Sequence, residues 1–211
     1  MNKSFKISQW RRKHSGEKKS IKVIGVGCGG GNVVNHLHDF GSNEFSLAVC
    51  GMDRTALECS KVPTTLQLGI DGLGAGNNPE AGQLEAEKKA KDIRILLENN
   101  TDIVFIVTCL GGGCGTGAAP VIARESRALG ITTIGVASIP FDFEGNKRYE
   151  QALNGVRELT KNSDALFLLN NQSIIRHHRG LPMAEVFANA DKMMCEVIEK
   201  LADSISVSSK G

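Results

Sequence analysis

Two glycine-rich stretches of the chain have the residue types that bind phosphate groups. The first runs from Gly25 to Gly31 (GVGCGGG) and the second from Gly111 to Gly117 (GGGCGTG). Glycine has no Cβ atom, so its backbone can adopt positive φ angles and approach a ligand closely. Each stretch lies between an apolar run and an amphipathic segment, so free N–H groups at a helix N-terminus would face an anion. The pattern predicts two phosphate-binding loops; a glycine-rich turn without a ligand is the alternative.

A third loop, at residues 69–79 (GIDGLGAGNNP), contains four more glycines. Three such loops suit a ligand with several consecutive phosphates, such as a nucleoside triphosphate. The spacing Gly25-x-Gly27-x-x-Gly30 also fits the dinucleotide fingerprint, and Asp53 lies at about the distance of a ribose-binding acid. An NAD-dependent Rossmann oxidoreductase is therefore an alternative, although its site needs only one such loop. The chain has no G-x-x-x-x-G-K-[ST] sequence, which excludes a P-loop NTPase.

The elements that would position these loops alternate between strand and helix. Predicted strands lie at 21–26, 46–50, 65–68, 103–108, 131–137 and 165–169, and the β-branched residues of the first suit a buried parallel strand. Predicted helices lie at 32–40, 80–97, 121–129, 146–160 and 182–204. Alternation of this kind predicts an α/β fold with a doubly wound parallel sheet and helices on both faces. Since ligands bind outside the carboxyl ends of such strands, the three loops should meet at one edge.

Composition and charge indicate one globular domain with a basic arm. The chain has 211 residues and 41% of them are hydrophobic, which is sufficient for one sizeable core. Residues 1–22 carry a formal net charge of +7, whereas the whole chain carries +2. We therefore expect a basic flexible tail at residues 1–20 and a domain at residues 21–211. Trp10 beside three basic residues would suit an anionic membrane surface; a solvated tail is the alternative, and no specific nucleic-acid partner is expected.

The six cysteines do not form a metal-binding pattern. They occur at positions 28, 50, 59, 109, 114 and 195, without a C-x-x-C pair or flanking histidines. We expect no metal site made by the protein, and reduced thiols of a cytoplasmic protein. The sequence contains neither a signal peptide nor a run of about 18 apolar residues, so neither export nor a membrane span is predicted.

Four motifs in one order resemble the tubulin/FtsZ family of GTPases, most closely its bacterial cell-division members. They lie at residues 24–32, 72–79, 111–120 and 140–145 (PFDFEG). The resemblance extends from about residue 21 to about residue 201. It implies a three-layer Rossmann-like domain that ends in a long central helix and binds GTP or GDP with Mg²⁺. It also implies a role in septation and contacts with other FtsZ-like subunits.

The resemblance assigns the phosphates to residues of the three glycine loops, among which the 74–76 loop senses the γ-phosphate. These residues are Gly27, Cys28, Gly29, Gly30, Gly31, Asn32, Gly74, Ala75, Gly76, Gly112, Gly113, Cys114, Gly115, Thr116 and Gly117. It also implies that Glu144 and Arg148 flank the ribose and phosphates. Asn170 would read guanine, Phe187 would stack on the base, and Asp191 would accept from the guanine N1–H and amino group.

The spacing of Phe187 and Asp191 is compatible with these roles. Residues i and i+4 of a helix share a face, so one side chain can stack on a base while the other bonds its edge. Adenine lacks the two donors that a carboxylate would accept. The alternatives are core packing for Phe187, a solvated charge for Asp191, and a surface charge for Arg148.

The sequence departs from the family pattern at several positions. Cys114 occupies a position that is usually threonine, and Gly51-Met52 replaces a usual Asn-Thr before Asp53. The activating Asn-x-Asp-x-x-Asp loop and the C-terminal domain of the family are not found. We therefore expect no catalytic residue in this chain and GTP hydrolysis only with a neighbouring FtsZ subunit. A non-hydrolysing regulator that caps FtsZ filaments is the alternative, and apolar residues near the end, such as Leu201, are expected to be exposed.

Overall fold

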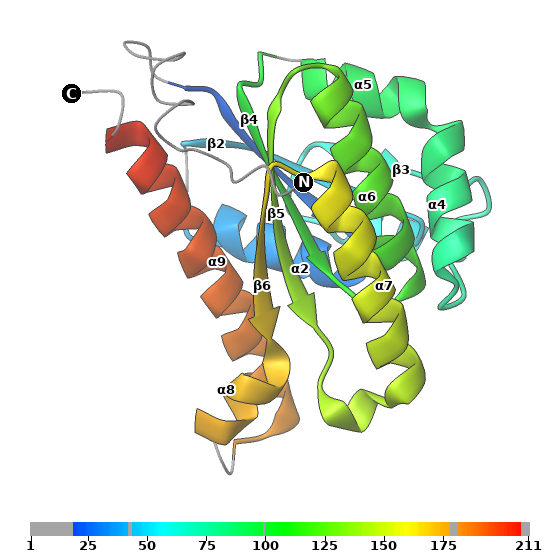
Figure 1. Cartoon of the computed structure of the whole chain (residues 1–211), viewed down its shortest axis with the longest axis vertical. Coiled ribbons are helices and arrows are strands. Elements are labelled where there is room, and N and C mark those ends of the chain that lie inside the picture. The colour runs from blue at the N-terminus through cyan, green and yellow to red at the C-terminus, as the bar shows by residue number, and fades with distance from the viewer. Residues whose placement is uncertain (1–18, 42–43, 99, 178–180, 208–211) are drawn as a thin grey trace.

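A parallel sheet of six strands runs through the centre of the molecule (Figure 1). The computed structural model describes residues 19–41, 44–98, 100–177 and 181–207. The strands are β1 (Ile21–Val26), β2 (Phe45–Gly51), β3 (Thr65–Gln67), β4 (Ile103–Cys109), β5 (Thr132–Ile139) and β6 (Ala165–Asn170). Their order in the sheet is β3-β2-β1-β4-β5-β6, and every pairing is parallel. The chain reverses its winding direction between β1 and β4, which is where such sheets open a crevice for ligands.

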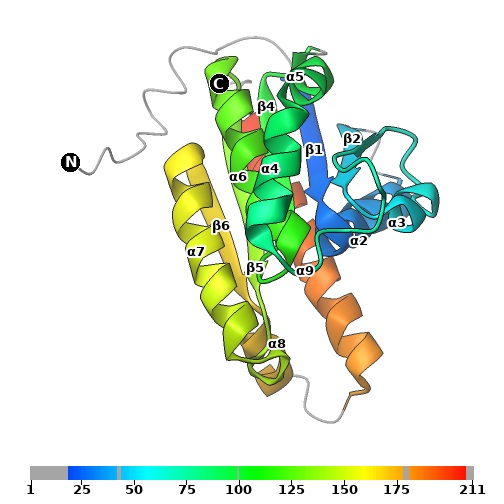
Figure 2. The ribbon, with the colours of Figure 1, turned by 90° about the vertical axis from the view of Figure 1, so that its right-hand side faces the viewer.

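Helices cover both faces of the sheet, as predicted (Figure 2). They are α2 (Gly27–Asp39), α3 (Arg54–Glu58), α4 (Pro79–Lys88), α5 (Ala90–Glu98), α6 (Gly113–Ala128), α7 (Asn146–Asn162), α8 (Asn171–His177), α9 (Met183–Val207) and the 3-10 turn η1 (Asp142–Glu144). Helices α2 and α9 pack together on one face. Helices α6 and α7 cover the other face, with α4 and α5 packed against α6.

Successive buried residues of the central strands enter two different cores. Phe105 of β4 belongs to the core beneath α2 and α9, together with Val34 and Ile198. Its neighbour Ile106 belongs to the core beneath α6, together with Ile122. Because side chains alternate across a strand, a strand covered on both faces is a nearly continuous apolar run, as β4 is from Ile103 to Val107. The expected three-layer α/β fold is therefore confirmed.

The helices differ from the predicted ranges chiefly at their starts. Those predicted at 32–40 and 121–129 begin earlier, at Gly27 and Gly113, inside the glycine loops. Some of these glycines are required by close packing, since a Cβ at Gly30 would lie 2.3 Å from the Val107 oxygen and one at Gly117 only 1.9 Å from the Pro79 oxygen. Glycine has low intrinsic helix propensity, so the sequence pattern placed these residues in loops, but tertiary packing keeps them helical.

Three further predictions about the chain need correction or lie outside the described residues. The helix predicted at 80–97 is divided at Lys89 into α4 and α5. Leu201, expected to be exposed, is half-buried against the core beneath α9, because that helix lies along the sheet. The basic arm at residues 1–20 lies almost entirely outside the described residues. No helix in the described part of the chain is long and apolar enough to cross a membrane.

Candidate functional site

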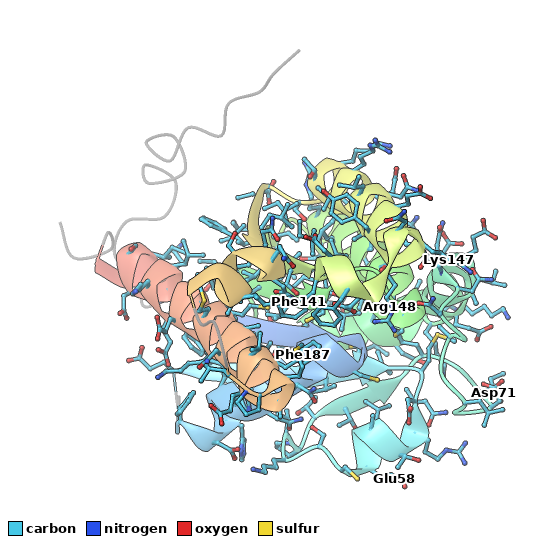
Figure 3. The ribbon with its side chains drawn as sticks, turned by 90° about the horizontal axis from the view of Figure 1, so that it is seen from below. Glu58, Asp71, Phe141, Lys147, Arg148 and Phe187 are labelled. Carbon is cyan, nitrogen blue, oxygen red and sulfur yellow. The ribbon has the colours of Figure 1, made fainter. Side chains whose placement is uncertain are left out.

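A cavity of about 460 Å³ opens at the carboxyl ends of the central strands. Figure 3 views the molecule from this end. The first turns of α2 and α6 line one part of the cavity, and Phe187 and Asp191 of α9 line another. Residues far apart in the sequence, from Val26 to Asp191, therefore share one hollow, as the parallel sheet predicts.

The first turns of α2 and α6 lie next to each other at the cavity. A Cβ at Gly27 would be 2.9 Å from the Gly115 nitrogen, so only a glycine allows this approach. Neither helix has a side chain that caps its N-terminus. The N–H groups of both first turns lack intrahelical acceptors, and the two helix dipoles add positive potential at the same place. This part of the cavity is suited to an anion.

Most of the loop residues predicted to bind phosphate line the cavity. These are Gly27, Cys28, Gly29, Gly31, Asn32, Gly74, Ala75, Gly112, Gly113, Cys114 and Gly115. Gly30, Gly76, Thr116 and Gly117 do not line it. Thr116 is buried, and its hydroxyl accepts a hydrogen bond from the Gly111 nitrogen at 2.8 Å, so it stabilises the loop from behind.

Three cysteines line the cavity, namely Cys28, Cys109 and Cys114. Burial raises the pKa of Cys109 and of Cys114 to about 11 and also raises the pKa of Cys28. At neutral pH these thiols are therefore uncharged, and they add no negative charge beside the two helix N-termini. Sulfur at position 114 is thus compatible with an anionic ligand, although it offers only a weak donor where a hydroxyl would donate well.

Glu144 and Arg148 form an ion pair at the rim of the cavity. The Glu144 carboxylate accepts from the Phe141 nitrogen at 2.9 Å and from Arg148 Nη1 at 2.7 Å. The sharp turn between η1 and α7 needs Gly145, whose φ is +95°. Both charged residues line the cavity, as Phe187 does, and Figure 3 labels Arg148 and Phe187 at this end of the molecule. Arg148 is exposed, so the alternative of a surface charge for Arg148 stays open.

Phe187 and Asp191 share one face of α9, as their spacing predicts. Phe187 is 43% exposed as a residue, and its ring meets the Phe141 ring edge-on, with the centroids 5.1 Å apart. The Phe187 ring is therefore supported by Phe141 but accessible from the cavity, so Phe187 is not a core residue. Burial raises the pKa of Asp191 to about 6, and nearby His36 opposes this rise. Asp191 is half-buried, so the alternative of a fully solvated charge does not apply either.

Comparison with known proteins identifies the family. Residues 20–178 match the model of the Tubulin/FtsZ family, GTPase domain. The chain belongs to the tubulin/FtsZ family. This membership does not favour the alternative of a Rossmann oxidoreductase, and it agrees with the resemblance carried by the four motifs.

Individual members of the tubulin/FtsZ family match over most of the chain. The cell division protein FtsZ of Porphyromonas gingivalis is 43% identical over 195 residues, which are 90% of this chain and 43% of that protein. An empty FtsZ dimer from M. jannaschii is 30% identical, with a TM-score of 0.86, and the match covers 95% of this chain and 58% of that one. The GTPγS-bound CetZ2 protofilament of Haloferax volcanii, at 23% identity and a TM-score of 0.79, covers 87% and 58% and shows the shared fold. The chain therefore spans less than half the length of the curated relative.

For this tubulin/FtsZ chain, the asparagine expected to read guanine is not the one that lines the cavity. Asn170 is exposed at the end of β6, and its Oδ1 accepts from the Gln172 nitrogen at 2.9 Å. Asn171 lines the cavity instead and is buried. Among the described residues its Oδ1 has no hydrogen-bond partner. Two adjacent asparagines cannot be told apart by motif alone, because their orientation depends on where β6 ends and α8 begins.

The sequence analysis also missed several residues that line the cavity. Ser138 is the buried, second-to-last residue of β5, and Asn35 lies on the third turn of α2. Asn35 Oδ1 accepts from Ser60 Oγ at 3.0 Å and from the Lys61 nitrogen at 2.9 Å, so it fixes the segment after α3. A strand-end serine was the available signal for Ser138. The position of Asn35 depends on α2 starting at Gly27, which the sequence did not indicate.

Proposed function

We propose that this chain is the nucleotide-binding part of a cell-division GTPase of the FtsZ type and binds GTP and GDP. One observation carries the proposal. A single cavity contains two uncapped helix N-termini and, on α9, an open aromatic ring one turn from a half-buried carboxylate. The first feature suits phosphates and the second suits a base with two adjacent donors. The same proposal places the protein in the cytoplasm at the division site.

Guanine selection would depend on Asp191 and Phe187. A carboxylate can accept from both the N1–H and the amino group of guanine, whereas adenine presents an acceptor at the corresponding ring nitrogen. The Phe187 ring is held by Phe141, which packs with Val186 and Ala190 in a small separate core. A stacking surface supported in this way loses little side-chain entropy when the base binds. Asn171, with its unpaired oxygen, would offer a further acceptor.

Magnesium would be held mainly by the nucleotide. Within the described residues there is no group of three or more His, Cys, Asp or Glu side chains that could hold a metal ion. Mg²⁺ usually keeps several waters and binds substrate phosphates with few protein ligands, so this donor set fits a phosphate-bound ion. The ion would neutralise phosphate charge, while Arg148 and the helix N-termini would orient the phosphates.

Hydrolysis would require a group from another subunit. Among the described residues, three carboxylates line the cavity, and all of them have other tasks. Asp53 caps α3 through a 3.0 Å bond from the Ala56 nitrogen, Glu144 pairs with Arg148, and Asp191 lies on α9 beside Phe187. A water that attacks the γ-phosphate would therefore be activated by an acidic loop of a neighbouring FtsZ-like subunit. The M. jannaschii dimer and the CetZ2 protofilament show that relatives do associate.

Calorimetric titration with GTP, GDP and ATP tests the proposal. We expect both guanine nucleotides to bind at least about 100-fold more tightly than ATP, because ATP leaves the buried carboxylate unpaired. GTP turnover by the chain alone should be near background and should rise when full-length FtsZ subunits are added. Equal affinity for ATP would overturn guanine selection, and rapid hydrolysis by the isolated chain would overturn the need for a second subunit.

A further inference from the structure

A second hollow, of about 580 Å³, lies outside the nucleotide cavity. Residues of α4, α6 and α7 line it, including Gln83, Pro120 and Gln151, and we call it the outer groove. Asn77 lines both the outer groove and the nucleotide cavity. The segment 74–78 is therefore the wall between the two hollows.

The wall has an unusual backbone, and among the described residues few of its hydrogen bonds reach other elements. Gly74, Gly76 and Asn77 have positive φ angles of 80°, 55° and 56°, and a Cβ at either glycine would meet nothing within 4 Å. The segment is anchored at its start by the Gly74 nitrogen, which donates to the Met52 oxygen at 3.2 Å. At its end, Asn78 Oδ1 accepts from the Glu80 nitrogen at 2.9 Å. Between these anchors, the Ala75 carbonyl oxygen accepts from the Asn78 nitrogen at 2.9 Å, and Ala75 packs against the core beneath α6.

Gln151 of α7 holds this middle part. Its Nε2 donates to the Asn77 carbonyl oxygen at 3.1 Å. In the described part of the chain, this is the only hydrogen bond between residues 75–77 and another element. Gln151 follows Arg148 by one turn, so the same end of α7 contacts both the nucleotide cavity and its outer wall.

The oxygen of the Gln151 side-chain amide lowers the stability of the fold. Its Oε1 is buried and, among the described residues, has no hydrogen-bond partner. A buried acceptor without a partner destabilises a fold, and an apolar side chain of the same length would avoid the loss. Stability therefore does not explain the glutamine. The remaining contribution of Gln151 is the hydrogen bond that its side-chain nitrogen donates to the Asn77 carbonyl oxygen.

We infer that Gln151 is a positioning residue that holds the 74–78 wall against the terminal phosphate and so sets the preference for GTP over GDP. The inference rests on the proposed function. The wall lies against the start of α6, because a Cβ at Gly113 would be 2.7 Å from the Ala75 Cβ. It is therefore beside the phosphate-binding N-terminus, and on the resemblance it faces the third phosphate. Loss of the hydrogen bond would then weaken GTP binding more than GDP binding.

The test compares Gln151→Met with Gln83→Met. Both residues line the outer groove, but Gln83 Nε2 bonds Glu87 Oε1 within α4 at 3.1 Å and does not reach the wall. Affinities for GDP and for a non-hydrolysable GTP analogue are measured by calorimetry, with melting temperatures alongside. We expect Gln151→Met to lower the preference for the GTP analogue by about threefold to tenfold, the effect of one net hydrogen bond. Its melting temperature should be unchanged or higher, and Gln83→Met should keep the wild-type preference.

The outcomes separate this inference from the proposed function. If the wild-type chain binds neither nucleotide, both are overturned. If it binds both and Gln151→Met leaves the preference unchanged, or weakens both affinities equally with a lower melting temperature, only the inference is overturned. Gln151→Glu is the second variant. Its carboxylate cannot donate to the Asn77 oxygen, so it should lower the preference at least as much as methionine.

Discussion

At the residue scale, Asp191 shows how surroundings set the chemistry of a side chain. A carboxylate one turn from an aromatic ring has the type and spacing of a guanine reader, but its surroundings in the fold determine its protonation. Burial raises its pKa to about 6, although His36 acts against the rise. The group is thus ionised at neutral pH and becomes neutral in mildly acidic solution.

This shift predicts a pH dependence of guanine-nucleotide affinity. Below pH 6 the Asp191 carboxyl is protonated and would lose its proposed acceptor role, so affinity for GDP should fall by up to about tenfold per pH unit. The folded-state pKa lies above the ordinary value of an aspartate, so the ionised group lowers stability above pH 6. This cost is relieved as the pH falls toward 4. Asp191→Asn should therefore raise the melting temperature at pH 7 and abolish the pH dependence of GDP affinity. Calorimetric titration with GDP between pH 5 and 8, with melting temperatures alongside, tests both expectations.

Cys28 offers a second test at the residue scale. It is exposed and lines the nucleotide cavity, whereas Cys59 is exposed outside it. A bound nucleotide would cover Cys28 only, since accessibility controls alkylation of a thiol. Saturating GDP should slow maleimide labelling of Cys28 by at least about tenfold, the difference between a covered and an open thiol. Mass spectrometry measures both sites, and equal protection of Cys59 would contradict the placement of the ligand.

At the element scale, Gly112, which precedes α6, and Gly117, which lies within it, have different structural roles. Gly112 precedes the helix and borders open space, since a Cβ there would meet no atom within 4 Å. Gly117 lies where α4 crosses α6, and a Cβ there would be 1.9 Å from the Pro79 oxygen. One glycine leaves room for a ligand, and the other allows two helices to pack closely.

Alanine at these two positions should therefore affect different properties, nucleotide binding at Gly112 and fold stability at Gly117. Gly112→Ala places a methyl group in the phosphate-binding part of the cavity, so it should weaken GDP binding with little change in melting temperature. Gly117→Ala separates α4 from α6 and should destabilise the fold by about 1–3 kcal/mol or more, as overpacking does. Thermal denaturation and calorimetry on both variants check this. Similar melting temperatures for the two would contradict the packing role of Gly117.

At the scale of the whole molecule, the site exists only where the layers meet. Its walls come from α2, α6 and α9, which pack on opposite faces of the sheet, together with loops that follow four strands. A ligand that contacts so many elements binds the folded state alone. Binding must then stabilise the entire domain by linkage.

Thermal denaturation with added nucleotide is the corresponding test. At a concentration 100 times its dissociation constant, GDP should stabilise the domain by about 2.7 kcal/mol. For a chain of this length that corresponds to a rise of about 5–10 °C in melting temperature. The same concentration of ATP should give a rise of less than about 2 °C. A larger shift with ATP than with GDP would contradict the guanine-binding site.

The sequence alone was sufficient to predict the alternation of strands and helices, the parallel sheet and the positions of the glycine loops. These depend on local patterns, because apolar runs, β-branched residues and helical periodicity are properties of neighbouring residues. The first strand was predicted with its observed bounds, Ile21–Val26. The resemblance to the family likewise depended on motifs that are continuous in the chain.

Tertiary structure decided what depends on contacts between distant residues. The exclusion of Gly117 from the cavity follows from α4 crossing α6, and the choice of Asn171 over Asn170 follows from where β6 ends. The hydrogen bond from Gln151 to Asn77 joins residues 74 positions apart, which no local pattern encodes. The sequence determined which residue types could bind a nucleotide, and packing determined which of them face one cavity.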